Sequence, residues 1–207
     1  QGGPASGAVE RSRAKRAYRT PAAGALEPAL MADGVPADQV YAVLSTPEGL
    51  ERALNKIREL KPHIAVWWSS GAQHAQLMVD GEGDMVTGWN GRFDGAAKNG
   101  AAVKYTFNQA LLDYDCYAIA KGAPHKDLAM KFLAEISKPE YQAEFTKYIT
   151  YGPTNVKAYE LGLIDGEYAR KLPSHPDNAA RQLPIDIQWY FKNEAEASAA
   201  YQNLLTE

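Results

Sequence analysis

The sequence predicts an α/β layered architecture, and two patterns carry this prediction. Short apolar runs that are typical of buried strands are separated by segments in which apolar residues recur at helical spacing. These patterns alternate along most of the chain, as in layered α/β folds. Ligands of such folds bind beyond the strand ends, so residues at these positions are the first candidates for a site.

The composition is that of a globular chain without a strong charge bias. The 207 residues are 45% hydrophobic, and 22 basic and 25 acidic side chains give a formal charge of −3. Attraction to nucleic acid or an anionic membrane is therefore not expected. Cys116 is the one cysteine, which excludes an internal disulfide. No apolar run reaches the roughly 20 residues of a spanning helix, and the first residues lack the pattern of a signal peptide, as in a mature or truncated secreted chain.

Residues 1–24 differ in composition from the rest of the chain. They are rich in Gly, Ala, Ser, Arg and Pro, and basic residues cluster between Arg11 and Arg19. We interpret this segment as a disordered or weakly held leader. A nucleic-acid or lipid arm is the alternative, but Tyr18 is its only aromatic residue, so a solvated tail is favoured.

The regular pattern begins at residue 25. A helix is expected from the capping pair Thr46–Pro47 to Lys61–Pro62, with one apolar face. That face consists of Leu50, Leu54, Ile57 and Leu60. Residues 63–68 form a short apolar run bounded by a proline and a Ser-Ser-Gly turn, which indicates a buried strand, and residues 73–79 suggest a short helix.

Further strands are expected at residues 84–89, 103–107 and 115–120, each next to turn residues or alternating with polar positions. A helix follows at residues 128–136, and Pro139 begins the next one. Inward-facing positions are expected on that second helix and beyond it: Tyr141, Phe145, Tyr148 and Ile149. The remainder is expected to be largely helical.

Catalytic and metal-binding patterns are missing from the sequence. It has no Gly-x-Ser-x-Gly, phosphate-loop, His-Glu-x-x-His or dinucleotide-binding motif. The histidines are not at metal-ligand spacing, so surface or turn positions are favoured for all of them: His63, His74, His125 and His175. We therefore expect a protein that is not an enzyme and that needs neither metal nor cofactor.

Two clusters are chemically richer. Trp89-Asn90-Gly91-Arg92 brings an indole, an amide and a guanidinium to the end of an expected strand, although these residues alone favour core packing as the role of the tryptophan. Asp113-Tyr114-Asp115 places two carboxylates around an aromatic ring, which suits an organic ammonium ligand. The same pair could be structural, or the acid and base of a hydrolase, and spacing alone does not decide between these roles.

Several segments resemble the polyamine-type extracellular solute-binding proteins of ABC transporters, in the family's order and spacing. They are residues 29–35, 66–73, 88–92, 115–124, 129–133 and 151–155. The resemblance covers about Leu26–Glu207 and implies a type II periplasmic-binding-protein-like bilobal fold that is N-terminally truncated, so that the opening part of the first lobe is missing. It also implies a second-lobe region at 25–90, a returning part of the first lobe at 91–150, and C-terminal helices spanning the lobes at 151–207.

The resemblance also implies a binding site. Trp89 is similar to the aromatic residue that stacks on the ligand's methylene chain, and Asp115 is similar to the carboxylate that holds an amine. The other candidate contacts are Asp113, Arg92, Tyr151 and either Trp189 or Tyr190. The implied function is the substrate-binding component of an ABC importer, located in the periplasm or otherwise outside the cytoplasm, with putrescine or spermidine as ligand and a membrane permease as partner.

Two departures from the family's pattern leave a second ligand class open. Residues 21–24 contain no acid for a second amine, and the cation Arg92 beside Trp89 would repel a dication but suit a carboxylate. A zwitterionic amino acid similar to aminobutyrate is therefore the alternative ligand. Because half a lobe is expected to be missing, its uncovered strand edges could also pair in a homodimer.

Overall fold

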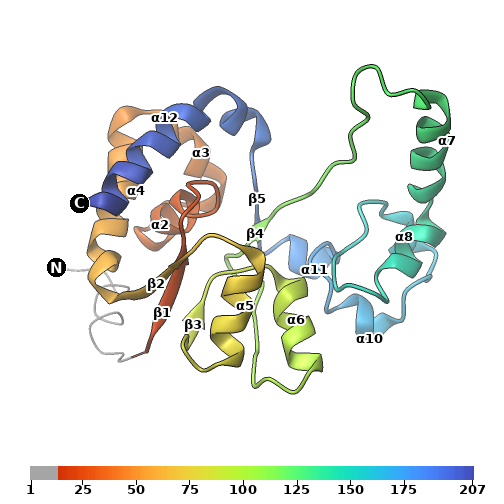
Figure 1. Cartoon of the computed structure of the whole chain (residues 1–207), viewed down its shortest axis with the longest axis horizontal. Helices are drawn as coiled ribbons and strands as arrows, with labels where there is room; N and C mark the ends of the chain where they lie inside the picture. Colours follow the sequence, from red (N-terminus) through yellow and green to blue (C-terminus); the bar gives the residue numbers. More distant parts are fainter. Residues whose placement is uncertain (1–13) are drawn as a thin grey trace. The chain divides into compact units, whose positions relative to one another are not determined.

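A computed structural model describes residues 14–207, which form two compact units (Figure 1). Of the described residues, the first unit comprises residues 14–111 together with Leu183–Glu207, and the second comprises Leu112–Gln182. The expected boundaries near residues 90 and 150 therefore do not coincide with the compact units. Assigning either unit to a family lobe remains a prediction.

The first unit is built on a parallel sheet of three strands in the order β2–β1–β3. The strands are β1 (Arg16–Arg19), β2 (Ile64–Trp68) and β3 (Met85–Val86). In the register, Ala17 of the central strand pairs with Val66 on one side and Val86 on the other. Parallel neighbours need long crossover connections, and helices lie in both of them.

Helices make up most of the first unit. They are α2 (Leu26–Ala32), α3 (Val40–Leu44), α4 (Pro47–Leu60), α5 (Gly71–Val79), α6 (Asn90–Lys98) and α12 (Ile187–Thr206), with short 3₁₀ turns at Ala37–Gln39 and Lys61–His63. Strands β4 (Leu111–Leu112) and β5 (Leu183–Pro184) form a separate pair where the chain leaves this unit and returns. The main core therefore combines segments from both ends of the sequence.

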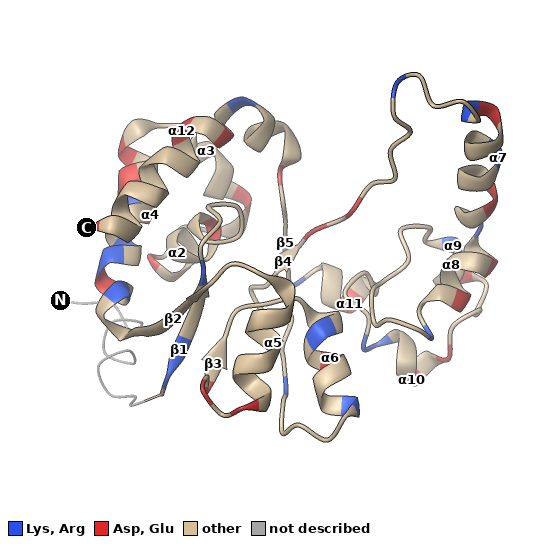
Figure 2. Cartoon of the chain, in the orientation of Figure 1, with Lys and Arg blue, Asp and Glu red and all other residues tan. Residues whose placement is uncertain are grey.

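Helix α4 confirms the prediction for this part of the sequence. The Thr46 hydroxyl accepts a hydrogen bond from the Gly49 N–H at 3.0 Å, which caps the first turn, and Pro47 occupies its start. Leu54 and Ile57 are buried against the core. Acidic and basic residues follow one another along the helix (Figure 2), as expected for an amphipathic helix.

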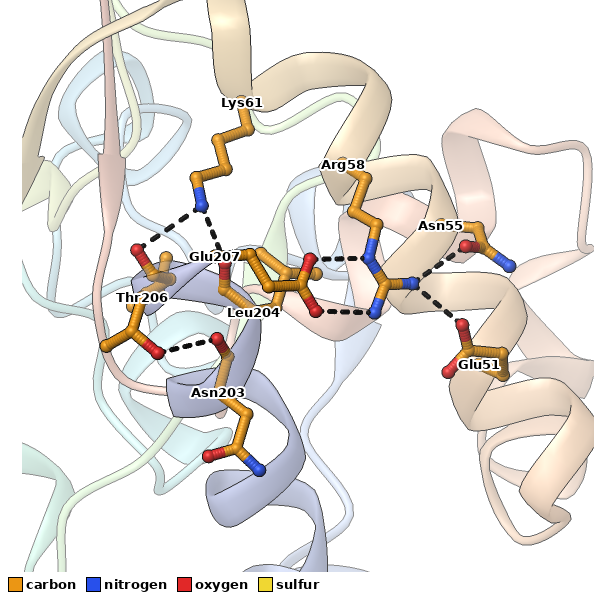
Figure 3. Close-up of polar contacts among 9 residues, drawn as sticks. Glu51, Asn55, Arg58, Lys61, Asn203, Leu204, Thr206 and Glu207 are labelled. Atoms are coloured by element: carbon orange, nitrogen blue, oxygen red, sulfur yellow. Dashed lines mark hydrogen bonds and ion pairs between the residues drawn. The ribbon is translucent and has the colours of Figure 1, made fainter.

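Helix α12 packs beside α4, and the side chains of Arg58 and Lys61 bind its C-terminal end (Figure 3). The Arg58 guanidinium donates to both carboxylate oxygens of Glu207, at 2.8 and 3.0 Å. Lys61 Nζ donates to the Leu204 carbonyl at 2.7 Å, which satisfies an acceptor that the last helical turn leaves free. Tyr201 and Leu204 are buried in the main core, so α12 is a structural part of the first unit.

The second unit is a set of helices with a small core. They are α7 (Lys126–Ile136), α8 (Pro139–Phe145), α9 (Lys157–Glu160), α10 (Gly166–Ala169) and α11 (Pro176–Ala179). Its core consists of Ala143, Ala158, Ile164, Ala169 and Leu172. Large apolar side chains on α7 and α8 remain exposed, among them Leu128, Phe132 and Phe145.

Several expectations about secondary structure were wrong. The leader assignment fails for residues 14–24, because β1 lies there with Ala17 and Tyr18 buried between two neighbouring strands; residues 1–13 lie outside the described part of the chain. The strand expected at 84–89 is reduced to Met85–Val86. Residues 103–107 and 115–120 form no strand, because no segment among residues 14–207 pairs with them.

The inward orientation expected for the aromatic residues around α8 was also wrong. Tyr141 and Phe145 are about half exposed, and Tyr148 is exposed over 79% of its surface. Tyr141 and Phe145 lie on α8, whereas Tyr148 and Ile149 lie beyond its end, so the expected residues do not form one helical face. On α8, Ala143 is the residue that belongs to the core of the second unit, and its side chain is only a methyl group.

Candidate functional site

Trp89 lies at a turn between β3 and α6, where it occupies the N-cap position of the helix. Its indole is 38% exposed, so it is only partly a core residue. Its ring centroid lies 5.7 Å from that of Trp68 and 5.2 Å from that of His74, with edge-to-face geometry in both pairs. The turn therefore presents an aromatic side chain that is supported by other rings and remains accessible.

Gly71, at the start of α5, provides the space for this arrangement. A methyl group at Gly71 would lie 2.6 Å from Trp89 Cζ3 and 3.7 Å from Arg92 Nε. The indole and the guanidinium are therefore neighbours over the same glycine. Arg92 is exposed and makes no ion pair or side-chain hydrogen bond within residues 14–207.

His74 is fully buried beside Trp89, which corrects the surface or turn position expected for it. Its Nε2 accepts a hydrogen bond from the Trp89 N–H at 3.2 Å. Burial is the main cause that lowers the imidazole pKa to about 4, and the positive charges of Arg92 and Arg19 contribute to this shift. The imidazole is therefore neutral near pH 7.

Three other predicted ligand contacts, Asp113, Asp115 and Tyr151, belong to the second unit. Asp113 and Asp115 are exposed, and Asp113 Oδ1 accepts a hydrogen bond from the Tyr114 N–H at 2.9 Å. Asp115 makes no ion pair or side-chain hydrogen bond in the described part of the chain. Tyr151 is partly buried in the turn between α8 and α9, where its N–H donates to the Ile149 carbonyl.

Tyr190 and Trp189 lie in the core of the first unit at the start of α12. The Tyr190 hydroxyl donates to Glu27 Oε1 at 2.8 Å, and the Trp189 indole N–H donates to Ser45 Oγ at 2.9 Å. Both polar groups therefore have partners within the fold. These interactions favour a structural role for the two residues over the ligand contact that was expected for one of them.

Residues 14–207 contain neither a candidate metal site nor a helix that could span a membrane. No group of His, Cys, Asp and Glu side chains there is suited to a metal ion, and Cys116 is exposed and unpaired. In the same part of the chain, no helix has both the length and the apolar character needed to cross a membrane.

Comparison with known proteins identifies the family. Residues 6–173 match the family described as bacterial extracellular solute-binding proteins. The chain belongs to this family. It is 38% identical over 182 residues to the gamma-aminobutyric acid-binding protein of Pseudomonas aeruginosa, a match that covers 88% of the chain and 51% of that relative. It is 25% identical over 158 residues to the spermidine/putrescine-binding periplasmic protein of Salmonella typhimurium, covering 75% and 43%.

Solved structures agree with this assignment. The binding protein MotA from A. tumefaciens B6, in complex with glucopine, is 46% identical with a TM-score of 0.86, covering 95% of the chain and 61% of that structure. An ABC transporter substrate-binding protein from Bradyrhizobium japonicum is 42% identical with a TM-score of 0.85, covering 95% and 60%. The α/β fold expected from the resemblance is therefore confirmed.

The family membership also confirms two other expectations. Its members are binding proteins, so the chain is not an enzyme, and the family is extracellular, which places the chain outside the cytoplasm. The polyamine type is not distinguished, because relatives named for γ-aminobutyrate and for spermidine or putrescine both match. The chain spans about half the length of the curated relatives, 51% and 43% of these two.

Proposed function

We propose that the chain is part of the substrate-binding component of an ABC importer and that its ligand is a zwitterionic amino acid similar to γ-aminobutyrate. The observation that carries the proposal is the pair formed by Trp89 and Arg92 over Gly71: an accessible indole beside a guanidinium that lacks an acidic partner within residues 14–207. The 38% identity to a gamma-aminobutyric acid-binding protein supports the same ligand class.

The chemistry of this pair suits a short amino acid. A guanidinium donates two parallel hydrogen bonds to a carboxylate, and the positive end of the α6 dipole adds to the attraction. An indole covers the methylene groups of the ligand and removes apolar surface from water. For the ammonium group we propose Asp115, with Asp113 beside it in the sequence, because a carboxylate binds an ammonium through charge-assisted hydrogen bonds.

Putrescine or spermidine remains the second candidate, supported by the 25% identity to spermidine/putrescine-binding proteins. Arg92 argues against a dication, because a positive charge beside the ring that covers the methylene chain would repel an amine at that end. A membrane permease is the partner that the proposed function requires.

Isothermal titration calorimetry with γ-aminobutyrate and putrescine tests the proposal. We expect Arg92→Gln to weaken γ-aminobutyrate binding by about tenfold or more, because a charged hydrogen-bond donor to the carboxylate is lost. Arg181→Gln, which removes an exposed arginine of the second unit, is the matched control and should leave the affinity unchanged. Binding of putrescine alone, strengthened by Arg92→Gln, would identify the polyamine ligand instead. No heat with either compound would refute the proposal for this chain.

A further inference from the structure

His74 connects the end of β2 with the start of α6, at the turn that carries Trp89. Its ring centroid lies 4.6 Å from Trp68, 5.2 Å from Trp89 and 5.2 Å from Phe93. Its side chain is fully buried, and its Nε2 accepts the backbone N–H of Trp89 at 3.2 Å. One residue thus contacts both the backbone and the ring of Trp89.

We infer that neutral His74 is a positioning residue for Trp89, which holds the indole in place for the ligand. This inference rests on the proposed function for the role of Trp89, whereas the connection between the two residues rests on geometry alone. It also names the chemical state that the connection requires: His74 with a free lone pair on Nε2 and its hydrogen on Nδ1. Within residues 14–207, Nδ1 is buried and has no hydrogen-bond partner, so the bond from the Trp89 N–H is what selects this tautomer.

The need for an acceptor at this point follows from helix geometry. The first N–H groups of a helix have no carbonyl partner in the helix, and a buried N–H without an acceptor is costly. Trp89, the N-cap residue of α6, makes no side-chain capping hydrogen bond. Imidazole Nε2 can accept only when it carries no hydrogen, so an imidazolium could not make this bond.

The close packing of Gly88, the residue before Trp89, also links His74 to the turn. A methyl group at Gly88 would lie 2.6 Å from Phe93 Cζ and 2.8 Å from His74 Nε2, and closer still to His74 Cδ2. The backbone that enters the Trp89 position therefore passes directly against the imidazole. A shift of the imidazole would move both the backbone before Trp89 and the surface on which the indole rests.

The surroundings of His74 favour the neutral form. The rings packed against it, Trp68 of β2 and Trp89 and Phe93 of the turn and α6, carry no charge. Arg92 of α6 and Arg19 of β1 are the charged groups that act on it, and both are positive. They oppose a second positive charge, so the acceptor at Nε2 persists through mildly acidic conditions.

Two substitutions distinguish the role of His74 as a hydrogen-bond acceptor from the role of its ring in packing. His74→Gln keeps an amide oxygen that can reach the Trp89 N–H, whereas His74→Phe keeps a ring of similar shape and removes the acceptor. The first measurement uses ¹⁵N NMR of the unliganded protein. We expect the Nδ1–H tautomer of His74, and hydrogen exchange of the Trp89 amide that is at least about tenfold faster in His74→Phe than in the wild type or His74→Gln. An Nε2–H tautomer, or equal exchange in all three proteins, would overturn the inference.

Ligand binding gives the second measurement, with γ-aminobutyrate as the probe. We expect His74→Phe to weaken binding by about tenfold and His74→Gln to retain more of the affinity. The amide exchange of the β1–β2 ladder reports whether each variant is folded, and Gly95→Ala, at an open position on α6, is the control substitution. Normal affinity in a folded His74→Phe would contradict the positioning role.

Trp89→Ala separates a failure of this inference from a failure of the proposed function. If Trp89→Ala leaves γ-aminobutyrate binding intact, the role proposed for the indole is wrong, while the NMR result still decides whether His74 holds the turn. If Trp89→Ala abolishes binding and His74→Phe does not change it, the proposed function stands and the positioning role is refuted.

Discussion

The Tyr190 hydroxyl donates a 2.8 Å hydrogen bond to Glu27 Oε1 and so joins α12 to α2 across 163 residues of sequence. Tyr41 donates to the same oxygen at 3.0 Å, and the Gly24 N–H donates to Oε2 at 2.9 Å. Glu27 is fully buried, and a buried carboxylate needs several donors to remain in the core. This cluster makes α12 an integral part of the first unit.

Replacing Tyr190 with Phe should therefore affect stability and not ligand binding. We expect Tyr190→Phe to lower the free energy of unfolding by about 1–3 kcal/mol, because the buried carboxylate loses a donor. Urea denaturation measures this change, with Tyr148→Phe, at an exposed position of the second unit, as the control. Loss of γ-aminobutyrate binding at unchanged stability would instead make Tyr190 a ligand contact.

The pKa of His74 predicts a loss of stability in acid. Burial lowers this pKa from 6.5 to about 4, so the unfolded chain binds the proton more tightly than the folded chain does. The stabilising contribution is complete above pH 6.5 and is lost as the pH falls towards 4. Its size is about 3 kcal/mol, since each unit of pKa difference corresponds to about 1.4 kcal/mol.

The measurement compares denaturation of the wild type and His74→Gln between pH 7 and 4. Burial raises the pKa of Glu27, which acts in the opposite direction, because a carboxyl of raised pKa favours the folded state at low pH. Both proteins contain Glu27, so the difference between them isolates His74. A His125→Gln control removes an exposed histidine. Parallel pH profiles for the wild type and His74→Gln would refute the prediction.

The elements that could be predicted are those whose own stretch of sequence contains the signal for them. Helix α4 has a capping threonine, a first-turn proline and one apolar face within a single stretch of sequence, and β2 is a continuous apolar run. Strand β1 has no comparable signal, since its ends are Arg16 and Arg19 and only Ala17 and Tyr18 lie between them; it becomes a strand because β2 and β3 pair with it. Residues 115–120 show the converse: apolar character without a pairing segment gives no strand.

The sequence likewise predicted only those parts of the candidate site that have a local signal. Trp89 and Arg92 could be found because they follow an apolar run and precede a helix start. The buried His74 was missed, although its spacing from Leu77 places both on the same face of α5, and this was the one available signal. Tyr190 was expected near the ligand. Its hydrogen-bond partner, Glu27, lies in α2, and nothing in the sequence around Tyr190 indicates this contact.

Exposed apolar residues on α7 predict self-association of the chain. Leu128 and Phe132 are exposed over 67% and 59% of their surfaces, and large exposed apolar patches are characteristic of interaction sites. We expect sedimentation velocity to show a concentration-dependent increase in mass that Phe132→Asp reduces. Val79→Asp, at a half-exposed position on α5 in the first unit, is the control. A monomer at all concentrations would rule out the homodimer.

The contact between Arg58 and Glu207 predicts a small, salt-dependent contribution to stability. Both side chains are exposed at the surface, where ion pairs are weak and are screened by salt. We expect Arg58→Ala to lower the melting temperature slightly in dilute buffer, and the difference to shrink at about 1 M NaCl. Glu207→Gln should have a smaller effect, because Arg58 keeps its ion pair with Glu51. An effect that salt does not change would indicate that Arg58 acts through packing.

A pair of glycine substitutions tests how closely the Trp89 turn is packed. A methyl group at Gly88 would collide with the rings of Phe93 and His74, whereas one at Gly95 meets nothing within 4 Å. Gly88→Ala should therefore destabilise the first unit by about 1–3 kcal/mol and shift the tryptophan fluorescence, since overpacking moves the rings. Gly95→Ala should stabilise it by about 0.5–1 kcal/mol, because alanine loses less backbone freedom in a helix. Thermal and urea denaturation of both variants measure these changes. Equal stability of the two variants would show that the turn can shift without a cost in free energy. His74 and Phe93 would then not hold Trp89 in a fixed position.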